Sequence, residues 1–491
     1  MNGAMIIGPG ERLRLFVTAM LVYALCLTPV LFNPMTWTAL DAAVSLVETG
    51  RWQVTHGDLY YDNDVAMAGS RKVGGPPPGL AFAMVPTYAV WRAVAGVVDT
   101  PESFVALHVF ATIVIGAAAS ALAAGEVAAL ARVLGAGVSG ARWAAILFAF
   151  GTPAFLFAVR LYKENLAALI VVAAFRLALT AETGRRWALA GLLGGAAGLV
   201  AYPSGLIGLG VAAIALARAG RRTLVPVALG GAVALVWLSL YNAWLFGRPW
   251  RFAYSSYLNM PGAADVHDVH FRLPSVFVLV NSLVNQREGL LFYSPFLALG
   301  IVGLVTAWRG GWRMPVAVTA IFALALWGLS AAWLAQFPMS FTGARYLFPA
   351  VPLLAAFAAP VLERVGAPAR WTLAIVSIGL TYLIVQAGHI ADPAPLLYAA
   401  KTFVSGTGLP VLFKETLPAW LGLETLHTTL ARPDVSGRDL VRMLATPAGW
   451  RLAANQALML VASLAAFAAV AGVIRRVWTP PAVAPTEALA R

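Results

Sequence analysis

The acidic residue Asp41 lies on the polar stripe of a helical pattern that runs over residues 36–50. The apolar stripe of this pattern comprises Trp37, Leu40, Val44 and Val47, and the polar stripe comprises Thr38, Asp41, Ser45 and Glu48. A helix of this kind is typical of a membrane interface, where Asp41 would lie at headgroup depth. A carboxylate at that depth can take a proton from an aqueous acceptor beside a lipid-borne phosphate. The alternative is an ordinary solvated polar face.

Basic residues that could bind a phosphate occur in two short segments. Arg160, Lys163 and Glu164 are spaced i, i+3 and i+4, so we expect them to share one helix face at the membrane edge. Arg345 follows a run with Ser340, Thr342 and Gly343, and an arginine can form two parallel hydrogen bonds to a phosphate. The alternatives are local pairing or snorkelling for the first group and a simple interface anchor for Arg345.

Two further segments contain residue types that bind metal ions. The first contains His56, Asp58, Asp62 and Asp64 and continues to Arg71 and Lys72, and the second contains Asp265, His267, Asp268 and His270. Carboxylates and imidazoles bind divalent cations, but neither spacing matches a defined motif. An acidic turn and a flexible polar loop are therefore the alternatives, and the metal requirement stays open.

The composition shows what kind of fold must position these residues. Of the 491 residues, 60% are hydrophobic and only 11% are charged, so the chain has too little polar surface to enclose its apolar mass in water. Apolar runs of about 20 residues, enough to cross a bilayer, recur along the chain. We expect an all-α polytopic membrane protein with about twelve spans, at residues 13–33, 104–131, 142–159, 164–181, 187–202, 204–218, 223–245, 289–307, 314–335, 345–362, 371–390 and 452–473.

The arginines that give the net charge of +13 indicate topology rather than nucleic-acid binding. With a cytoplasmic N-terminus, every inward connection is basic; these connections contain Arg132 and Arg142, Arg185 and Arg186, Arg218, Arg221 and Arg222, Arg309 and Arg313, Arg364 and Arg370, and Arg475 and Arg476. The apolar stretch 79–98 would invert this pattern if it crossed the membrane. We therefore place it in the outer interface, where Pro86 and Arg92 suit a bent helix.

The predicted topology gives one membrane domain over residues 1–478 and a disordered cytoplasmic tail over 479–491. Outward segments cover about 34–103, 246–288 and 391–451, and all four lysines, Lys72, Lys163, Lys401 and Lys414, fall on this outer side. The first apolar run lacks a small-residue cleavage site, so we interpret it as an uncleaved span. The single cysteine, Cys26, excludes an intramolecular disulfide.

The order of these features resembles the C-type superfamily of integral membrane glycosyltransferases, named GT-C. The similarity is greatest to the bacterial branch related to protein mannosyltransferases and the aminoarabinose transferase of lipid A. It rests on an early acid in a long first outer loop, a Pro-rich entry to a second interfacial helix, and a charged turn after the third span. Short segments at 241–242, 246–249, 289–295 and 343–347 also resemble pieces of such proteins.

This resemblance implies a glycosyltransferase that uses a polyprenyl-phosphate-linked sugar. Asp41 corresponds to the catalytic first-loop acid, with Ala42 where an acidic neighbour is common and Glu48 as a candidate substitute. Groups around the lipid phosphate are expected at Arg160, Lys163, Glu164, Arg345 and Lys72. The resemblance places the protein in the bacterial cytoplasmic membrane with its site facing the exterior, and implies inverting direct displacement by a hexosyl- or pentosyltransferase.

The expected partners are the lipid-linked donor, membrane lipid and an envelope glycan, lipid or protein as acceptor, without nucleic acid. The sequence contains neither a Walker loop nor a dinucleotide fingerprint, so no nucleotide cofactor is expected. A transporter or flippase of lipid-linked sugars is the alternative, because twelve spans are also common there. A transporter would favour two repeated halves, and no repeat is visible in the sequence. A non-catalytic scaffold is a third hypothesis.

Overall fold

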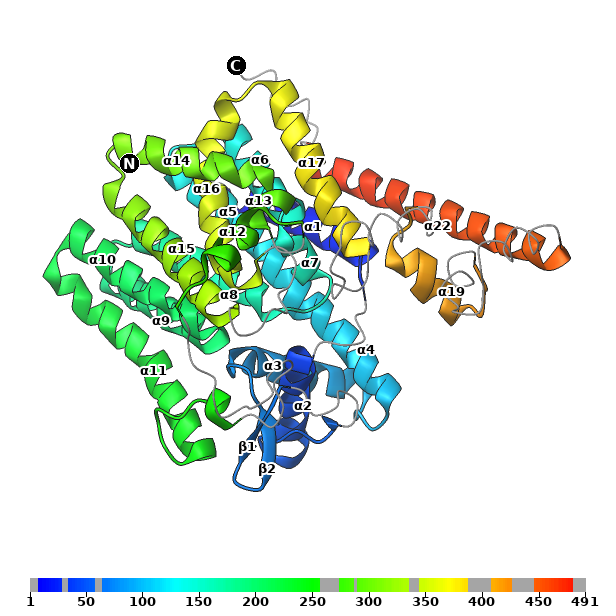
Figure 1. Ribbon diagram of the computed structural model, residues 1–491, viewed down its shortest axis with the longest axis horizontal. Helices are drawn as coiled ribbons and strands as arrows, with labels where there is room; N and C mark the ends of the chain where they lie inside the picture. The colour runs from blue at the N-terminus through cyan, green and yellow to red at the C-terminus, as the bar shows by residue number, and fades with distance from the viewer. Residues whose placement is uncertain are drawn as a thin grey trace, which may run out of the picture.

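The computed structural model describes residues 8–28, 34–57, 64–256, 273–286, 289–334, 344–386, 408–425 and 446–479. The predicted cytoplasmic tail, except Thr479, lies outside these ranges. The fold is an all-α bundle with one small antiparallel hairpin, as expected for a polytopic membrane protein (Figure 1). The predicted fold class is confirmed.

Two groups of elements follow one another along the chain. The first half contains α1 (Pro9–Leu25), α2 (Pro34–Thr49), β1 (Val65–Ala68), β2 (Arg71–Gly74), α3 (Gly79–Ala95), α4 (Pro101–Ala111), the π-helix η3 (Thr112–Ala117), α5 (Ala118–Val133), α6 (Val138–Phe150), α7 (Pro153–Ala158), α8 (Lys163–Thr180), α9 (Gly184–Val200), η4 (Tyr202–Leu206), α10 (Ile207–Ala219), η5 (Arg221–Thr223) and α11 (Leu224–Phe246). The second half contains η6 (Ala253–Ser256), α12 (Val276–Val284), α13 (Leu290–Tyr293), η8 (Pro295–Leu297), α14 (Ala298–Arg309), α15 (Arg313–Leu334), η9 (Arg345–Ala350), α16 (Val351–Arg364), α17 (Ala367–Gln386), η10 (Leu412–Thr416), α19 (Leu417–Trp420) and α22 (Pro447–Trp478).

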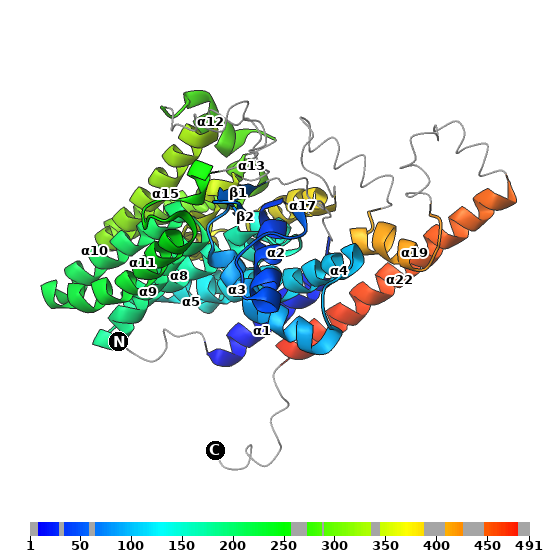
Figure 2. The same ribbon diagram turned by 90° about the horizontal axis from the view of Figure 1, so that it is seen from below.

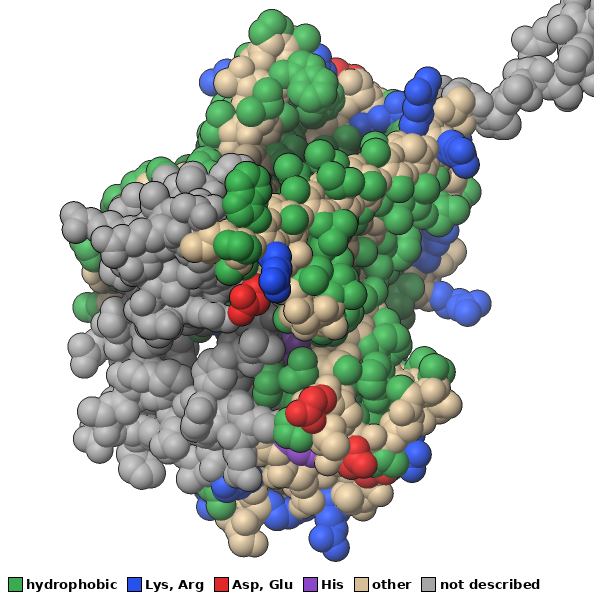
Figure 3. All heavy atoms as spheres, turned by 90° about the vertical axis from the view of Figure 1, so that its right-hand side faces the viewer, with side chains coloured by type: hydrophobic (Ala, Val, Ile, Leu, Met, Phe, Trp, Pro, Cys, Tyr) green, Lys and Arg blue, Asp and Glu red, His purple; other side chains and the backbone are tan. Residues whose placement is uncertain are grey.

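Within the described ranges, each predicted span overlaps one helix or consecutive helices, although the ends of the spans over 13–33, 314–335 and 371–390 lie outside these ranges. Within the described ranges, seven helical segments are long and apolar enough to cross a membrane: Pro101–Val133, Tyr202–Ala219, Arg221–Phe246, Arg313–Ala332, Arg345–Arg364, Ala367–Gln386 and Pro447–Trp478. On the face shown in Figure 3, hydrophobic side chains cover much of the described helices and charged side chains are scattered in small groups. Such a surface suits contact with lipid.

The span predicted over 142–159 is divided into α6 and α7. Gly151 ends α6, and Thr152 caps α7 by accepting a hydrogen bond from the backbone N–H of Ala154, while Pro153 occupies the first position of the new helix. Proline is favoured there because its nitrogen has no hydrogen to donate. The next turn after α7 contains Arg160, so this break sets where the chain reaches the charged residues.

Glycines allow α9 and α11 to pack at very short range. A Cβ atom added to Gly230 would overlap the carbonyl oxygen of Ala188, and one added to Gly191 would overlap that of Val227. The two helices lie side by side (Figure 1), with α8 packed on the other flank of α9. Close packing of small residues is a common way to associate helices in a membrane.

Two of the connections predicted to face inward contact each other, one at Arg142 in α6 and the other at the end of α22. Arg142 donates a hydrogen bond to Glu11 at 2.5 Å and lies over the ring of Trp478, and Trp478 donates to Thr18. The first residues of α1 and the last turn of α22 are accordingly on the same side, and α12 lies on the opposite side (Figure 2). This contact agrees with the prediction that Arg142 and the end of α22 lie on the same side of the membrane.

A compact unit of α2, the hairpin and α3 lies at one end of the bundle (Figure 1). The start of α3 packs on the end of α9, where a Cβ added to Gly79 would lie 2.6 Å from the carbonyl oxygen of Leu199. In the hairpin, Val65 pairs with Gly74 and Met67 with Lys72. The predicted helices over 36–50 and 79–98 are thus present as α2 and α3.

Candidate active site

Asp41 is completely buried in α2, and the backbone after Trp52 folds over it. One of its oxygens, Oδ2, accepts hydrogen bonds from the backbone N–H groups of Thr55 at 2.8 Å and His56 at 2.6 Å. The other oxygen, Oδ1, accepts a hydrogen bond from the Thr55 hydroxyl at 2.8 Å and lies 2.9 Å from His56 Nδ1. Donors to both oxygens stabilise the ionised carboxylate and fix its orientation.

The alternative of an ordinary solvated polar face on α2 does not hold for Thr38, Asp41 and Ser45. Thr38, Asp41 and Ser45 are as buried as the apolar stripe, because the hairpin and the segment 51–57 cover the polar face. The α2 helix is therefore enclosed within the outer unit instead of lying half in water. Buried polar groups need partners, and Thr55 and His56 supply them for Asp41.

Arg345 and Glu164 form a buried ion pair. The guanidinium Nε of Arg345 donates to Glu164 Oε1 at 2.7 Å, and both side chains are less than one-tenth exposed. Arg345 also contacts the sulfur of Met35 in the first turn of α2, and lies over the rings of Tyr162 and Tyr346. One arginine thereby joins the start of α2, the start of α8 and η9.

The turn between α7 and α8 does not continue a helix, which corrects one prediction. Leu161 adopts a left-handed conformation at φ 53°, which separates Arg160 from Lys163 and Glu164 in the first turn of α8. Arg160 therefore contacts the backbone of Val385 in α17 instead of sharing a face with Lys163. Non-glycine residues in this conformation are often found at functional sites.

A second left-handed residue, Ala344 at φ 50°, immediately precedes Arg345. The start of α8 is fixed by Asn165, whose amide donates to the carbonyl oxygens of Gly116 and Ala154. Gly116 belongs to the π-helix η3, in which the regular hydrogen-bond pattern is shifted, and such segments are frequent near functional sites. The local backbone thus holds the charged residues in fixed places.

Lys163 is 5% exposed, and within the described part of the chain its ammonium group makes no hydrogen bond and no ion pair. Its electrostatic neighbours are Glu164, Arg345 and Asp64. The Glu164 oxygen Oε2 is also buried without a hydrogen-bond partner among the described residues. Glu164 and Asp64 compensate only part of the cost of burying this ammonium group, so the position suits the binding of an anion.

Glu48 links α2 to α3. Its Oε1 accepts hydrogen bonds from the Tyr88 hydroxyl and from Arg92 Nε, both at 2.5 Å. The bond from Tyr88, together with the nearby Arg92 charge, lowers the pKa of the Glu48 carboxyl. Its geometry supports a structural role in the outer unit.

The metal candidates are only partly described. Asp58, Asp62, Asp265, His267, Asp268 and His270 lie outside the described residues, and within the described ranges no three metal-ligating side chains gather at one place. Asp64, at φ 57°, begins the hairpin, and Lys72 lies in β2 with an exposed side chain. Metal binding and a role of Lys72 at the donor stay predictions.

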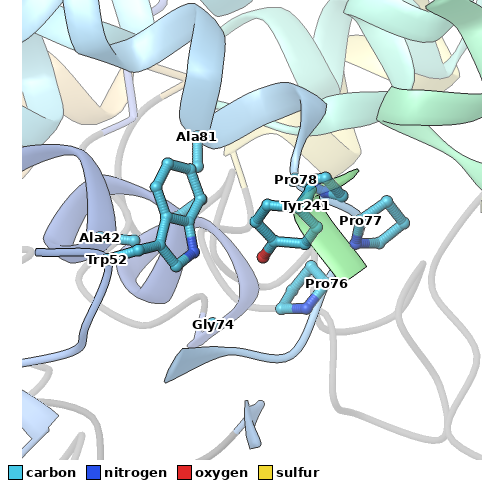
Figure 4. A pocket seen from close by; sticks show the side chains of 9 residues that line it. Ala42, Trp52, Gly74, Pro76, Pro77, Pro78, Ala81 and Tyr241 are labelled. Carbon is cyan, nitrogen blue, oxygen red and sulfur yellow. The ribbon is translucent and has the colours of Figure 1, made fainter. Parts of the chain in front are cut away.

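A small pocket opens beside α2, lined by Ala39, Ala42, Trp52, Gly74, Pro76, Pro77, Pro78, Ala81 and Tyr241. The rings of Trp52 and Tyr241 lie 5.5 Å apart, with the three prolines on the far side of the tyrosine (Figure 4). The predicted Pro-rich entry to α3 is thus one wall of this pocket. Aromatic faces and prolines offer a rigid apolar surface to a ligand ring.

Sequence reasoning missed three side chains near these groups: Tyr162, Thr55 and Lys414. Lys414 is 1% exposed and donates to the backbone carbonyl of Gln386 at 2.7 Å. The sequence contained an indication of Lys414, since a lysine inside an apolar run is rare unless it has a partner. The sequence contained no indication that Thr55 contacts Asp41, because this contact depends on the path of the loop.

No family model matches the sequence, and no curated protein matches it significantly. The fold is similar to that of ArnT from Cupriavidus metallidurans in the apo state, with a TM-score of 0.50, 16% sequence identity, and coverage of 92% of this chain and 76% of ArnT. A structure of the same ArnT bound to undecaprenyl phosphate gives a TM-score of 0.47 at 15% identity, covering 94% of this chain and 77% of ArnT. The chain therefore shares its fold with this ArnT, and that fold is the one the resemblance drawn from the sequence implied.

Proposed function

We propose that the protein transfers a sugar from a polyprenyl phosphate to an acceptor hydroxyl or amine at the outer face of the cytoplasmic membrane. The observation that carries this proposal is the buried Lys163 ammonium beside the Arg345 and Glu164 pair. The ArnT-like fold supports the class of reaction. The sugar and the acceptor are open.

The donor phosphate would bind between Lys163 and Arg345. The Nε of Arg345 donates to Glu164 and a terminal nitrogen lies 3.3 Å from the sulfur of Met35, so the guanidinium is held in one orientation beside Lys163. The backbone N–H groups in the first turn of α8 add favourable dipoles, since Tyr162 provides no side-chain cap there. Glu164 would orient the guanidinium and balance part of the positive charge.

The reaction would be a direct displacement at the anomeric carbon. The acceptor oxygen or nitrogen forms a bond to that carbon while the bond to the phosphate oxygen breaks, and polyprenyl phosphate leaves with the electron pair. Asp41 takes the acceptor proton, and Lys163 with Arg345 stabilises the charge that grows on the leaving phosphate. Attack opposite to the leaving group inverts the anomeric configuration.

The spacing along α2 suits these two roles. Met35, which contacts Arg345, and Asp41 are six residues apart, and a helix rises about 1.5 Å per residue, so the backbones of Met35 and Asp41 are separated by roughly 9 Å along the helix axis. A sugar ring can occupy such an interval between a phosphate and a base. Asp41 must first release Thr55 and His56, at least in part, when an acceptor arrives.

The test is turnover by the purified protein in nanodiscs with a panel of polyprenyl-phosphate sugars, measured as released polyprenyl phosphate. Transfer to an added envelope acceptor would support the proposal. Lys163→Met should abolish most of the release, whereas Arg451→Gln, a change of an exposed charge in α22, should leave it unchanged. Movement of labelled donor across the bilayer without any release would instead support a flippase.

A further inference from the structure

Arg160 and Lys414 meet at the C-terminal end of α17. A terminal nitrogen of Arg160 donates to the carbonyl oxygen of Val385 at 3.3 Å, and Lys414 Nζ donates to the carbonyl oxygen of Gln386 at 2.7 Å. The two side chains are 2% and 1% exposed. They come from the turn after α7 and from η10, which are more than 200 residues apart. Two like charges are thus enclosed at one helix end.

The carbonyl groups of α17 satisfy only a few of the hydrogen-bond donors of Arg160 and Lys414. A guanidinium has five N–H donors, yet in the described part of the chain Arg160 makes one hydrogen bond, and its buried Nε has no partner. Glu415 lies 3.9 Å from Lys414, but its side chain is 46% exposed and it stands at the rim. Burial lowers the pKa of Lys414 to about 8; the Glu415 carboxylate opposes this shift, and the charge of Arg160 adds to it.

The single carboxylate of Glu415 interacts with both Arg160 and Lys414, so the two buried positive charges are only partly compensated, which is unfavourable. A group that supplied negative charge and several acceptor oxygens would remove this cost. An oxyanion of the phosphate class does both, because it can accept from a guanidinium fork and from an ammonium at once. The unpartnered Nε of Arg160 is the donor that such a ligand would occupy.

The Arg160 and Lys414 pair adjoins the residues assigned to the donor phosphate. Tyr162 lies 5.5 Å from the Arg345 guanidinium and interacts electrostatically with both Arg345 and Arg160. One tyrosine thus lies within range of two separate cationic groups. A ligand with two anionic groups, or two ligands side by side, could occupy both.

We propose that Arg160 and Lys414 form a second anion-binding site, which takes a phosphate-class oxyanion next to the donor phosphate. This inference rests on the proposed function in one respect, the assignment of Lys163 and Arg345 as the neighbouring site for the donor phosphate. The oxyanion could be the second phosphate of a polyprenyl diphosphate or the headgroup phosphate of an anionic lipid. Both sources present the same chemistry to the two side chains, and an experiment can separate them.

The experiment measures binding to the full chain in nanodiscs of neutral lipid. The probes are polyprenyl monophosphate, polyprenyl diphosphate and short-chain phosphatidylglycerol, titrated against wild type, Lys414→Met and Lys414→Arg. The matched control is Arg451→Gln, which removes one exposed positive charge from α22. Monodispersity and thermal midpoint identify any variant that fails to fold, and Lys414→Arg keeps the charge if Lys414→Met does not fold.

If the site binds the second phosphate of a polyprenyl diphosphate, Lys414→Met should weaken diphosphate binding about tenfold or more, which is the effect of losing one charge-assisted hydrogen bond. Binding of the monophosphate should then be unchanged. If the site instead binds a lipid headgroup, Lys414→Met should weaken the binding of phosphatidylglycerol by the same factor and leave the binding of the other two probes unchanged. Lys414→Arg should retain binding in either case. Equal affinities of wild type and Lys414→Met for all three probes would overturn the proposal and leave Lys414 as a cap of α17. Because no sugar transfer is measured, failure of the proposed function would not produce that result.

Discussion

Arg345 Nε lies 2.7 Å from Glu164 Oε1, although 181 positions separate the two residues in the chain. The pair is enclosed by Met35 and by two tyrosine rings, so neither charge is well solvated. An ion pair of this kind adds little net stability, but loss of one partner leaves an uncompensated charge. Its value to the protein is the fixed orientation of a guanidinium next to Lys163.

Arg345→Lys should lower turnover by about tenfold or more, because an ammonium cannot bind Glu164 and a phosphate with the same planar fork. The measurement is kcat and KM for the donor, together with donor binding at equilibrium. The thermal midpoint should fall only slightly, since charge is retained. Kinetics identical to wild type would reduce Arg345 to an interface anchor.

The main charged groups were predictable from sequence because each is a rare polar residue at the edge of an apolar run. Asp41, Lys163, Glu164 and Arg345 were all found in this way. Their partners were not, since the contacts of Arg345 with Glu164 and of Asp41 with Thr55 depend on tertiary structure. The prediction that Arg160 and Lys163 share one helix face was wrong, because Leu161 adopts a left-handed conformation and interrupts the helix.

Labelling of single cysteines can test whether α3 crosses the membrane. In a Cys26→Ser background, Ser70→Cys in the hairpin turn and Glu102→Cys at the start of α4 are both exposed positions. If α3 lies in the outer interface, an impermeant thiol reagent should label both from outside intact cells. Glu182→Cys, in a predicted inward turn, is the protected control. Protection of only one of the first two positions would contradict the predicted topology.

Gly230→Ala should destabilise the bundle, because the new methyl group would overlap the carbonyl oxygen of Ala188 at the contact of α11 with α9. Overpacking typically costs about 1–3 kcal/mol, which predicts a fall of several degrees in the thermal midpoint. The neighbouring Gly231→Ala is a matched control, since the nearest atom to its Cβ is 3.6 Å away. Equal midpoints for the two variants would refute this packing.

The order of the membrane helices was predictable because length and hydropathy determine spans almost independently of their packing. Breaks within spans were harder to locate, as at Thr152, where a cap and a proline interrupt an otherwise apolar run. The burial of α2 was not predictable from its stripes. Both of its faces are covered, one by apolar neighbours and the other by hydrogen-bonding loop residues such as Thr55.

Asp41→Asn should lower the rate of transfer by a factor of about 10² to 10⁴, the usual contribution of a general base. An amide cannot take the acceptor proton, and it presents an NH₂ group where the carboxylate now accepts from Thr55 and His56. Donor affinity should be largely retained, since Lys163 and Arg345 are unchanged. Glu48→Gln should have a smaller effect, because Glu48 contacts α3.

The required control separates the chemistry of Asp41 from its support of the loop. Thr55→Val removes one hydrogen bond to Asp41 but keeps the carboxylate, so it should reduce the rate much less than Asp41→Asn. Turnover, donor binding and thermal midpoint are measured for all variants in nanodiscs. If Thr55→Val lowers the rate as much as Asp41→Asn, then Asp41 acts by holding the segment around Thr55. If Asp41→Asn transfers sugar at a near-normal rate, Asp41 is not the base, and Glu164 becomes the next candidate because its Oε2 is buried without a hydrogen-bond partner in the described part of the chain.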